Sequence, residues 1–394
     1  MKKLEKPSMK VLVTGATRNS CMAVIRGLSQ KRCEIVGADE RSLPFKMHSR
    51  YTGPYYSYPP GYGDDFVDAI IKIVQKEKPD VFLPVAGTKE ISKHRQLIER
   101  YTNVLLPDYE NYMTAFDNHL TLEACRKLHI GCPNIRHEKD VLHELENNRN
   151  RQNPVRFVLK PRSDIGGSRG LGIFHDEKSF HHYKKAGEKY GEAFITEYIP
   201  GPTSNMRTVN LLFDQNSELI ASFTTRKIRQ WPNSGGISAL TVSTHEPDLV
   251  DFILPFFKKY RWQGFAEAEI KIDERDGMPK LIEINPRFCG YIGFPIQCGV
   301  NFPWVMCQLI TGKRRPQMPA YSSGIKYIHW PTYLKAAYSE WRENRNRKEF
   351  FSKIREEIKG KKVSNNMEWQ DLKIIAAKMI FELLDRGKSS DVWN

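Results

Sequence analysis

The chain has 394 residues, 40% of them hydrophobic and 27% charged, which is ordinary for a globular protein and long enough for roughly two or three domains. Seven scattered cysteines without a CxxC pair argue against a disulfide scaffold or a zinc cluster and fit a reducing cytoplasm, and no apolar run reaches membrane-spanning length. The net charge of +15 favours anionic ligands, but because no nucleic-acid-binding motif accompanies it, we do not expect nucleic acid as a partner.

The first part of the chain alternates between short apolar runs and amphipathic stretches. Strands are predicted at residues 10–14, 34–38, 81–85 and 104–106, with helices between them. Such alternation is typical of a small α/β domain with a parallel, doubly wound sheet. We assign this domain to residues 1–116.

A lysine and a glycine-rich loop follow in the next part of the chain. The apolar strand 155–160 ends in Lys160, and the loop after it contains Gly166, Gly167, Ser168, Arg169 and Gly170. Glycines let backbone N–H groups approach phosphate oxygens closely, and the lysine would add a positive charge beside them. We therefore favour a phosphate-binding loop over a merely flexible hairpin. It is not a Walker A loop, because no Gly-Lys-Ser/Thr ends it.

A dense group of cations lies further along, ahead of the glycine pair at 235–236. It contains Arg226, Lys227 and Arg229. Phosphoryl and carboxylate groups need cations while they are transferred, so we favour an active-site role over an exposed basic loop. Arg226 and Arg229 are the predicted catalytic residues of this group.

Two strand-like runs, 264–272 and 281–287, are joined by a turn around Asp276-Gly277. Since side chains alternate along a strand, Glu283, Asn285 and Arg287 share one face, and in a hairpin Glu269 can face Glu283. Opposed like charges are destabilising, and a divalent cation between them resolves the repulsion. We predict a Mg²⁺ site, which Mn²⁺ could also fill, with three ligands: Glu269, Glu283 and Asn285. The alternative is a hairpin with a solvated polar face.

The run Glu283-Ile-Asn-Pro-Arg287 resembles the metal-binding strand of the ATP-grasp superfamily, and Lys160 and the glycine loop precede it in the order typical of that family. The resemblance covers about residues 10–315. It implies an α/β fold, α+β in the catalytic part: a Rossmann-like domain before a two-lobed ATP-grasp domain at 117–318. Within that domain, 117–200 would cover the nucleotide and 201–318 would bind the metal.

The same resemblance assigns roles to individual residues. Glu197, Tyr198 and Ile199 would form the hinge that binds adenine, and Thr203 stands where an acid often binds ribose. Asn118 stands where the family usually has a nucleotide-binding lysine. Lys160 would neutralise phosphate charge, and Arg287 would stabilise the oxygens of an acyl phosphate.

The activity that the resemblance implies is ATP-dependent ligation. A small-molecule carboxylate would take the γ-phosphate of ATP, and an amine would then attack the acyl phosphate, giving an amide, ADP and phosphate. Two alternatives remain open. One is a bicarbonate-dependent carboxylase on the same fold, and the other is a non-catalytic protein that binds nucleotides or a surface.

Residues 319–394 differ from the rest, and we predict a basic, helical C-terminal extension. Residues 335–362 have a helical pattern rich in Lys, Arg and Glu, and residues 371–384 form an amphipathic helical pattern. We favour packing on the body of the protein or on a second copy in a homodimer. Peripheral contact with a membrane surface is the less favoured alternative.

Overall fold

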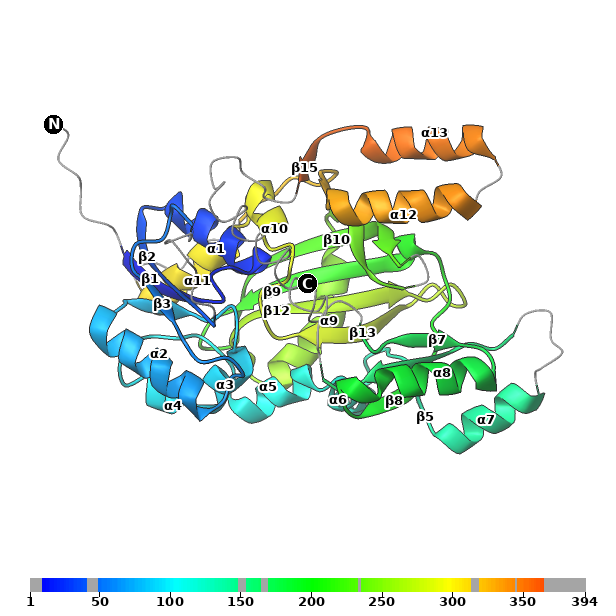
Figure 1. The fold of residues 1–394 in the computed structure, drawn as a ribbon, viewed down its shortest axis with the longest axis horizontal. Coiled ribbons are helices and arrows are strands. Elements are labelled where there is room, and N and C mark those ends of the chain that lie inside the picture. The colour runs from blue at the N-terminus through cyan, green and yellow to red at the C-terminus, as the bar shows by residue number, and fades with distance from the viewer. Residues whose placement is uncertain are drawn as a thin grey trace.

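The computed structural model describes residues 9–40, 49–147, 154–163, 169–232, 235–312, 319–343 and 346–364. Three sheets organise these residues, and Figure 1 shows a small one at each end of the molecule and the largest between them. This mixed α/β architecture confirms the predicted fold class. No helix within the described ranges combines the length and the apolar character needed to cross a membrane.

The first sheet is parallel, with the strand order β3-β2-β1-β4. Strand β1 is buried on both faces, since Val11 and Val13 join one hydrophobic cluster and Leu12 joins another. The predicted strand at 104–106 is absent, and only a bridge between Val81 and Asn103 continues the sheet there. The elements of this part are β1 (Met9–Thr14), α1 (Asn19–Ser29), β2 (Cys33–Asp39), β3 (Tyr55–Ser57), α2 (Asp64–Glu77), β4 (Val81–Leu83), α3 (Thr88–Lys93), α4 (Arg95–Ile98) and α5 (Tyr109–Phe116).

The second sheet is antiparallel, with the order β5-β8-β6-β7. Along β6, Phe157 and Leu159 pack in the lobe's own core, whereas Val158 and Lys160 point to the other face, which lines a cavity. The elements are α6 (Asn118–Lys127), β5 (Ile135–Arg136), α7 (Glu138–Asn147), β6 (Phe157–Pro161), β7 (Gly172–Phe174), α8 (Glu177–Gly187), the 3₁₀ turn η2 (Glu188–Tyr190) and β8 (Ala193–Glu197).

The third sheet has seven strands in the order β13-β12-β9-β10-β11-β14-β15. Helix α9 covers one face through Ile253, Phe256 and Phe257, which pack in the same cluster as residues of β9 and β12. The elements are the 3₁₀ turn η3 (Thr203–Asn205), β9 (Met206–Phe213), β10 (Leu219–Trp231), β11 (Ile237–Thr244), α9 (Pro247–Lys259), β12 (Gly264–Ile272), β13 (Pro279–Asn285), α10 (Gly293–Cys298), α11 (Phe302–Thr311), β14 (Lys326–Ile328), α12 (Trp330–Glu343), α13 (Arg347–Ile358) and β15 (Lys362–Ser364).

The first and third sheets share a hydrophobic core. Helices α10 and α11 return to pack against α1, and Asn301 Nδ2 donates a hydrogen bond to the carbonyl oxygen of Gly27 at 2.8 Å. Because Gly27 already meets Ile296 and Asn301, a larger side chain there would separate the two parts. The contact fixes the first domain against the end of the third sheet.

The C-terminal part differs from the predicted helical extension. Strand β14 pairs with β11, and β15 runs parallel to β14, so both complete the edge of the third sheet. Helices α12 and α13 do form within the predicted stretch. The predicted helix at 371–384 lies outside the described residues. The boundaries 1–116, 117–318 and 319–394 stay predictions, but β14 and β15 are strands of the third sheet.

Candidate active site

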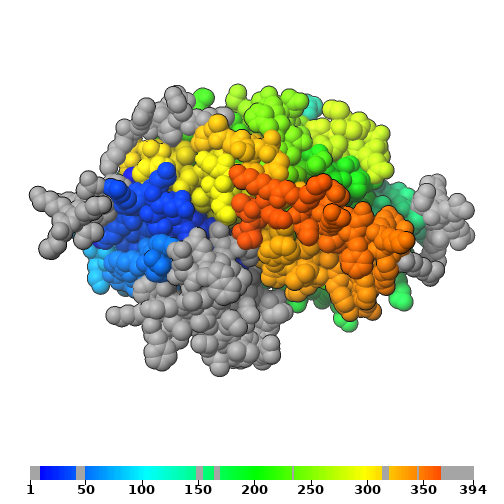
Figure 2. All heavy atoms as spheres, turned by 90° about the horizontal axis from the view of Figure 1, so that it is seen from above, coloured from blue at the N-terminus to red at the C-terminus, as the bar shows by residue number. Residues whose placement is uncertain are grey.

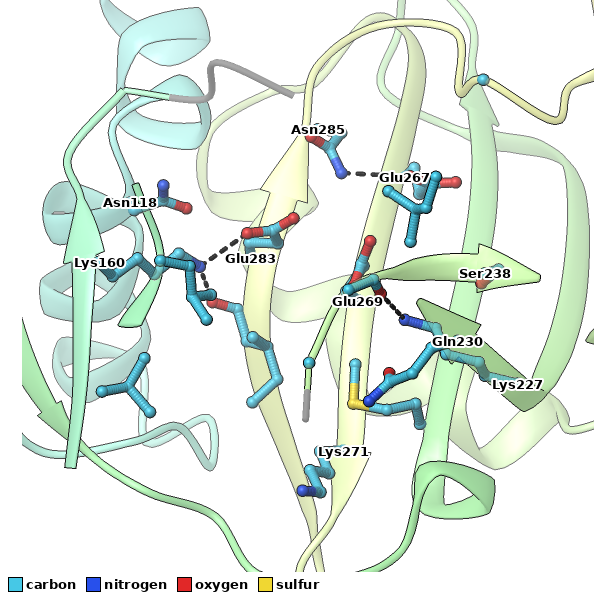
Figure 3. A pocket seen from close by; sticks show the side chains of 18 of the residues that line it. Asn118, Lys160, Lys227, Gln230, Ser238, Glu267, Glu269, Lys271, Glu283 and Asn285 are labelled. Atoms are coloured by element: carbon cyan, nitrogen blue, oxygen red, sulfur yellow. Dashed lines mark hydrogen bonds and ion pairs between the residues drawn. The ribbon is translucent and has the colours of Figure 1, made fainter. Parts of the chain in front are cut away.

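A cavity of about 870 Å³ lies between the second and third sheets and reaches the start of α1. Strands β6, β7 and β8 form one wall, β10 to β13 form the other, and Arg18, Asn19 and Ser20 come from the first domain. Figure 3 shows side chains from both walls pointing into this space. Its size is typical of a site for a small molecule or a nucleotide.

The floor of the cavity is the hairpin of β12 and β13. Glu269 pairs with Glu283 across the hairpin, as the sequence predicted, and Glu267 pairs with Asn285. Asn285 Nδ2 donates a hydrogen bond to Glu267 Oε1 at 3.1 Å, and Arg287 Nη2 donates to Asn285 Oδ1 at 3.4 Å. The hairpin therefore brings the carboxylates and the amide together on one side (Figure 3), and Arg287, two residues after its end, also lines the cavity.

These carboxylates repel one another and are poorly solvated. Burial, together with the facing charge of Glu283, raises the pKa of Glu269 to about 7. Burial also raises the pKa of Glu267. The surroundings of Glu267 and Glu269 thus disfavour the charged form of both carboxyl groups, and a bound cation would offset that cost.

Two lysines enter the cavity from opposite walls. Lys160, only 6% exposed, lies with its Nζ 2.7 Å from Glu283 Oε2 and donates to the carbonyl oxygen of Ile282 at 3.0 Å. Lys227, 7% exposed, donates to the carbonyl oxygen of Gly236 at 3.1 Å, and its charge opposes the upward shift in the pKa of Glu269. Both are buried cations beside the acidic floor (Figure 3).

The predicted hinge also lines the cavity, through Glu197, Tyr198, Ile199 and Thr203. The Tyr198 ring lies between two cations, with the Arg156 guanidinium carbon 4.1 Å and the Lys271 Nζ 4.8 Å from its centroid. Burial, followed by the charge of Arg156, lowers the pKa of Lys271 to about 8. The alternation of β12 places Lys271 on the same face as Glu269, so the spacing of the two residues in the sequence is enough to predict this position.

Glu197 has partners within the protein as well as its place at the cavity. Its Oε1 accepts hydrogen bonds from the backbone N and the Nδ2 of Asn134 at 3.0 and 3.1 Å, and its Oε2 lies 3.4 Å from Arg275 Nη1. The bond from its carboxylate to the exocyclic amine of adenine stays a prediction, since a carboxylate can accept further hydrogen bonds. Backbone groups of the hinge remain suited to that contact.

Asn118, the first residue of α6, lies at the end of strand β6. This residue is buried and lines the cavity, and its Nδ2 donates to the carbonyl oxygen of Pro161 at 3.0 Å. In this position it ties the start of α6 to the end of β6. Of the predicted loop, Gly166, Gly167 and Ser168 lie outside the described residues, Arg169 lines the cavity, and Gly170 has a φ of 74°.

Arg226 and Arg229 do not line the cavity, which corrects their predicted catalytic role. Arg226 is exposed, and Arg229 is buried and bonds Glu357 twice, from Nε at 2.9 Å and from Nη2 at 3.0 Å, with Glu340 2.6 Å from its Nη1. The pairing of β10 with β11 shifts between Lys227 and Arg229, so the simple alternation of faces breaks there. Lys227 and Gln230 face the cavity instead.

We expect Arg229→Met to destabilise the protein by roughly 3 kcal/mol, because Glu357 would be left buried without its cation. Urea unfolding followed by circular dichroism measures this change. Arg226→Met is the control, and its free energy of unfolding should stay within about 0.5 kcal/mol of wild type, as for other exposed positions. Equal losses in the two variants would contradict a structural role for Arg229.

Comparison with known proteins agrees with this geometry. Residues 191–332 match a family described as ATP-grasp in the biosynthetic pathway with Ter operon. A D-aspartate ligase of Enterococcus faecium is 26% identical over 253 residues, which cover 58% of this chain and 59% of that enzyme. The match thus spans about three fifths of the relative's length.

Solved structures show the same fold at low sequence identity. N5-carboxyaminoimidazole synthetase from Staphylococcus aureus, solved with ADP, has a TM-score of 0.63 at 15% identity, over 86% of this chain and 87% of that one. An L-amino acid ligase from Bacillus licheniformis has a TM-score of 0.57 at 12% identity, over 80% of this chain and 76% of that one. The chain contains an ATP-grasp domain. Within that class, it is a homologue of the D-aspartate ligase.

Proposed function

We propose that the protein is an ATP-dependent carboxylate–amine ligase, which forms an amide through an acyl phosphate and releases ADP and phosphate. One observation carries the proposal. Glu269 and Glu283 face each other across a hairpin, beside the buried Lys160, in a cavity that the predicted hinge residues also line. We also propose that the protein is located in the cytoplasm, where ATP is available.

The donor set fits a magnesium ion. Among the described residues, no three Cys, His, Asp or Glu side chains converge as a complete metal site. Mg²⁺ usually takes only one or two protein carboxylates and completes its shell with water and substrate phosphates. Glu269 and Glu283 would supply these carboxylates and Asn285 an amide oxygen, and Mn²⁺ could replace the ion. When bound, the metal would neutralise phosphate charge.

The remaining side chains of the cavity would act on the substrates. Lys160 and Lys227 would hold the transferred phosphoryl group from two sides, and Arg287 would stabilise the oxygens of the carboxylate as it becomes an acyl phosphate. The two sheets enclose the cavity and would limit the access of water, which otherwise hydrolyses an acyl phosphate. In this proposal the residues of the chain bind and orient the two substrates and the nucleotide, and the reaction needs no nucleophilic side chain.

The substrates are proposed as small: an amino acid, a peptide or a carboxylated small molecule. D-aspartate is the first candidate, because the E. faecium relative is named a D-aspartate ligase. Arg18 and Arg287 line the cavity away from the hinge and would suit an acidic substrate. A homodimer stays a prediction.

The test is release of ADP and phosphate from Mg-ATP with D-aspartate, other amino acids and small carboxylates, each with and without a pool of amines. Turnover that needs both an acid and an amine, with an amide identified by mass spectrometry, supports the ligase. Turnover that needs bicarbonate instead would identify the carboxylase alternative. Binding of ATP without turnover on any pool would favour a non-catalytic protein.

A further inference from the structure

Helices α12 and α13 lie beside each other on the outside of the third sheet (Figure 1). Tyr333 and Ala336 of α12 are buried and face the body of the protein, where Tyr333 packs in a cluster with residues of β11 and β14. The opposite side of α12 faces outward. In Figure 2 these two helices and β15 form one continuous part of the visible surface.

The outward side of α12 is apolar, contrary to the usual pattern of a surface helix. Trp330, Leu334, Tyr338 and Trp341 follow one another at spacings of four, four and three residues, so they form one stripe along the helix. Their exposed fractions are 42%, 61%, 60% and 39%. We call these four residues the aromatic stripe.

The stripe continues onto α13. The guanidinium carbon of Arg347 lies 4.3 Å from the centroid of the Trp341 ring, and Phe351, one turn further along α13, is 61% exposed. Within the described residues, five of the seven large hydrophobic side chains that are exposed belong to these two helices. An exposed apolar patch of this kind marks an interaction surface.

The charge around the stripe is positive. Residues 330–343 and 346–364 contain nine lysines and arginines against five glutamates. Two of those glutamates, Glu340 and Glu357, are turned inward by their ion pairs with Arg229. Lys335 and Arg342 are exposed on the same helix as the stripe.

We propose that this face binds the surface of a lipid bilayer that contains anionic lipids. Tryptophan and tyrosine favour the boundary between headgroups and acyl chains, and a leucine and a phenylalanine beside them would enter the apolar layer. The surrounding lysines and arginines match negatively charged headgroups. A second copy is a poorer partner, because two such faces would bring like charges together.

The aromatic stripe begins close to the cavity. Trp330 directly follows His329, which lines the cavity. A bilayer against the stripe would therefore lie next to the edge of the cavity formed by β14. The proposal does not depend on the ligase function, since it rests on the surface of α12 and α13 alone.

The test uses the full chain with vesicles of phosphatidylcholine, with and without phosphatidylglycerol. We expect co-sedimentation with the anionic vesicles only, loss of binding as salt increases, and a blue shift of tryptophan emission on binding. The double variant Leu334→Ser/Tyr338→Ser should bind the anionic vesicles at least about tenfold more weakly than wild type. Each substitution removes the free energy gained when the apolar side chain enters the lipid. Both positions are exposed, so the variant should keep its circular dichroism spectrum.

Tyr101→Ser/Met278→Ser is the matched control, because it removes two exposed hydrophobic side chains elsewhere, and it should bind like wild type. Failure of wild type to bind the anionic vesicles overturns the proposal. Equal binding by the Leu334/Tyr338 variant also overturns it. The proposal is also overturned if the wild type is a dimer and the variant a monomer, because a second copy would then cover the stripe. Protection of the stripe by residues 365–394 in the free protein would overturn it as well.

Discussion

Glu283→Gln is expected to lower kcat by about a hundred- to a thousandfold. The side chain lies 2.7 Å from Lys160 and opposite Glu269, so the proposed phosphate-binding lysine and the proposed metal site meet there. Glutamine keeps the shape and one oxygen but removes the negative charge that would attract Mg²⁺. Steady-state release of ADP, with saturating Mg-ATP and the acid and amine that the screen described above selects, measures the effect.

The control for this variant is Glu274→Gln. Glu274 is an exposed carboxylate in the turn of the same hairpin, outside the cavity, and its loss should leave kcat within about twofold of wild type. The melting temperature of Glu283→Gln reports two opposed effects, because the change relieves repulsion with Glu269 but removes the negative partner of the buried Lys160. Retention of near-normal turnover by Glu283→Gln, in a folded protein, would refute the metal assignment.

The acidic hairpin could be predicted from the sequence because local rules determine it. A short turn sets the register, and once the register is set, alternation decides which side chains share a face. Glu269 and Glu283 lie opposite each other for that reason. The parallel first sheet was predictable for a similar reason, since its strands are apolar on both faces.

The cations of β10 could not be assigned by the same rules. The pairing shift after Lys227 changes which residues face the cavity, and the sequence carries no local sign of it. The partner of Arg229 is Glu357, which is 128 residues away along the chain. A basic residue looks the same in sequence whether it binds a substrate or holds a distant helix in place.

The two strands after residue 318 were not predicted, because they are too short to show a pattern. Strands β14 and β15 have three residues each, and period-two alternation needs more. They form because the edge of the third sheet offers hydrogen-bonding partners. His329, which directly follows β14, enters the cavity through this pairing, and nothing in the sequence indicated it.

Lys227→Met is expected to lower kcat by about a hundredfold, whereas Arg226→Met should change it by less than about twofold. The two cations are adjacent in sequence, but Lys227 is buried in the cavity and Arg226 is exposed. The Lys227 ammonium would stabilise negative charge as the phosphoryl group is transferred. Methionine retains most of the side-chain volume, so the comparison isolates the charge.

Loss of Lys227 should not weaken the binding of metal. The ammonium group lowers the pKa of Glu269, but as a positive charge it also repels Mg²⁺. The Mg²⁺ concentration for half-maximal turnover should therefore not rise in Lys227→Met, and it should stay unchanged in Arg226→Met. The reverse result, a large loss in Arg226→Met and a small one in Lys227→Met, would show that the catalytic cations lie on the other face of β10.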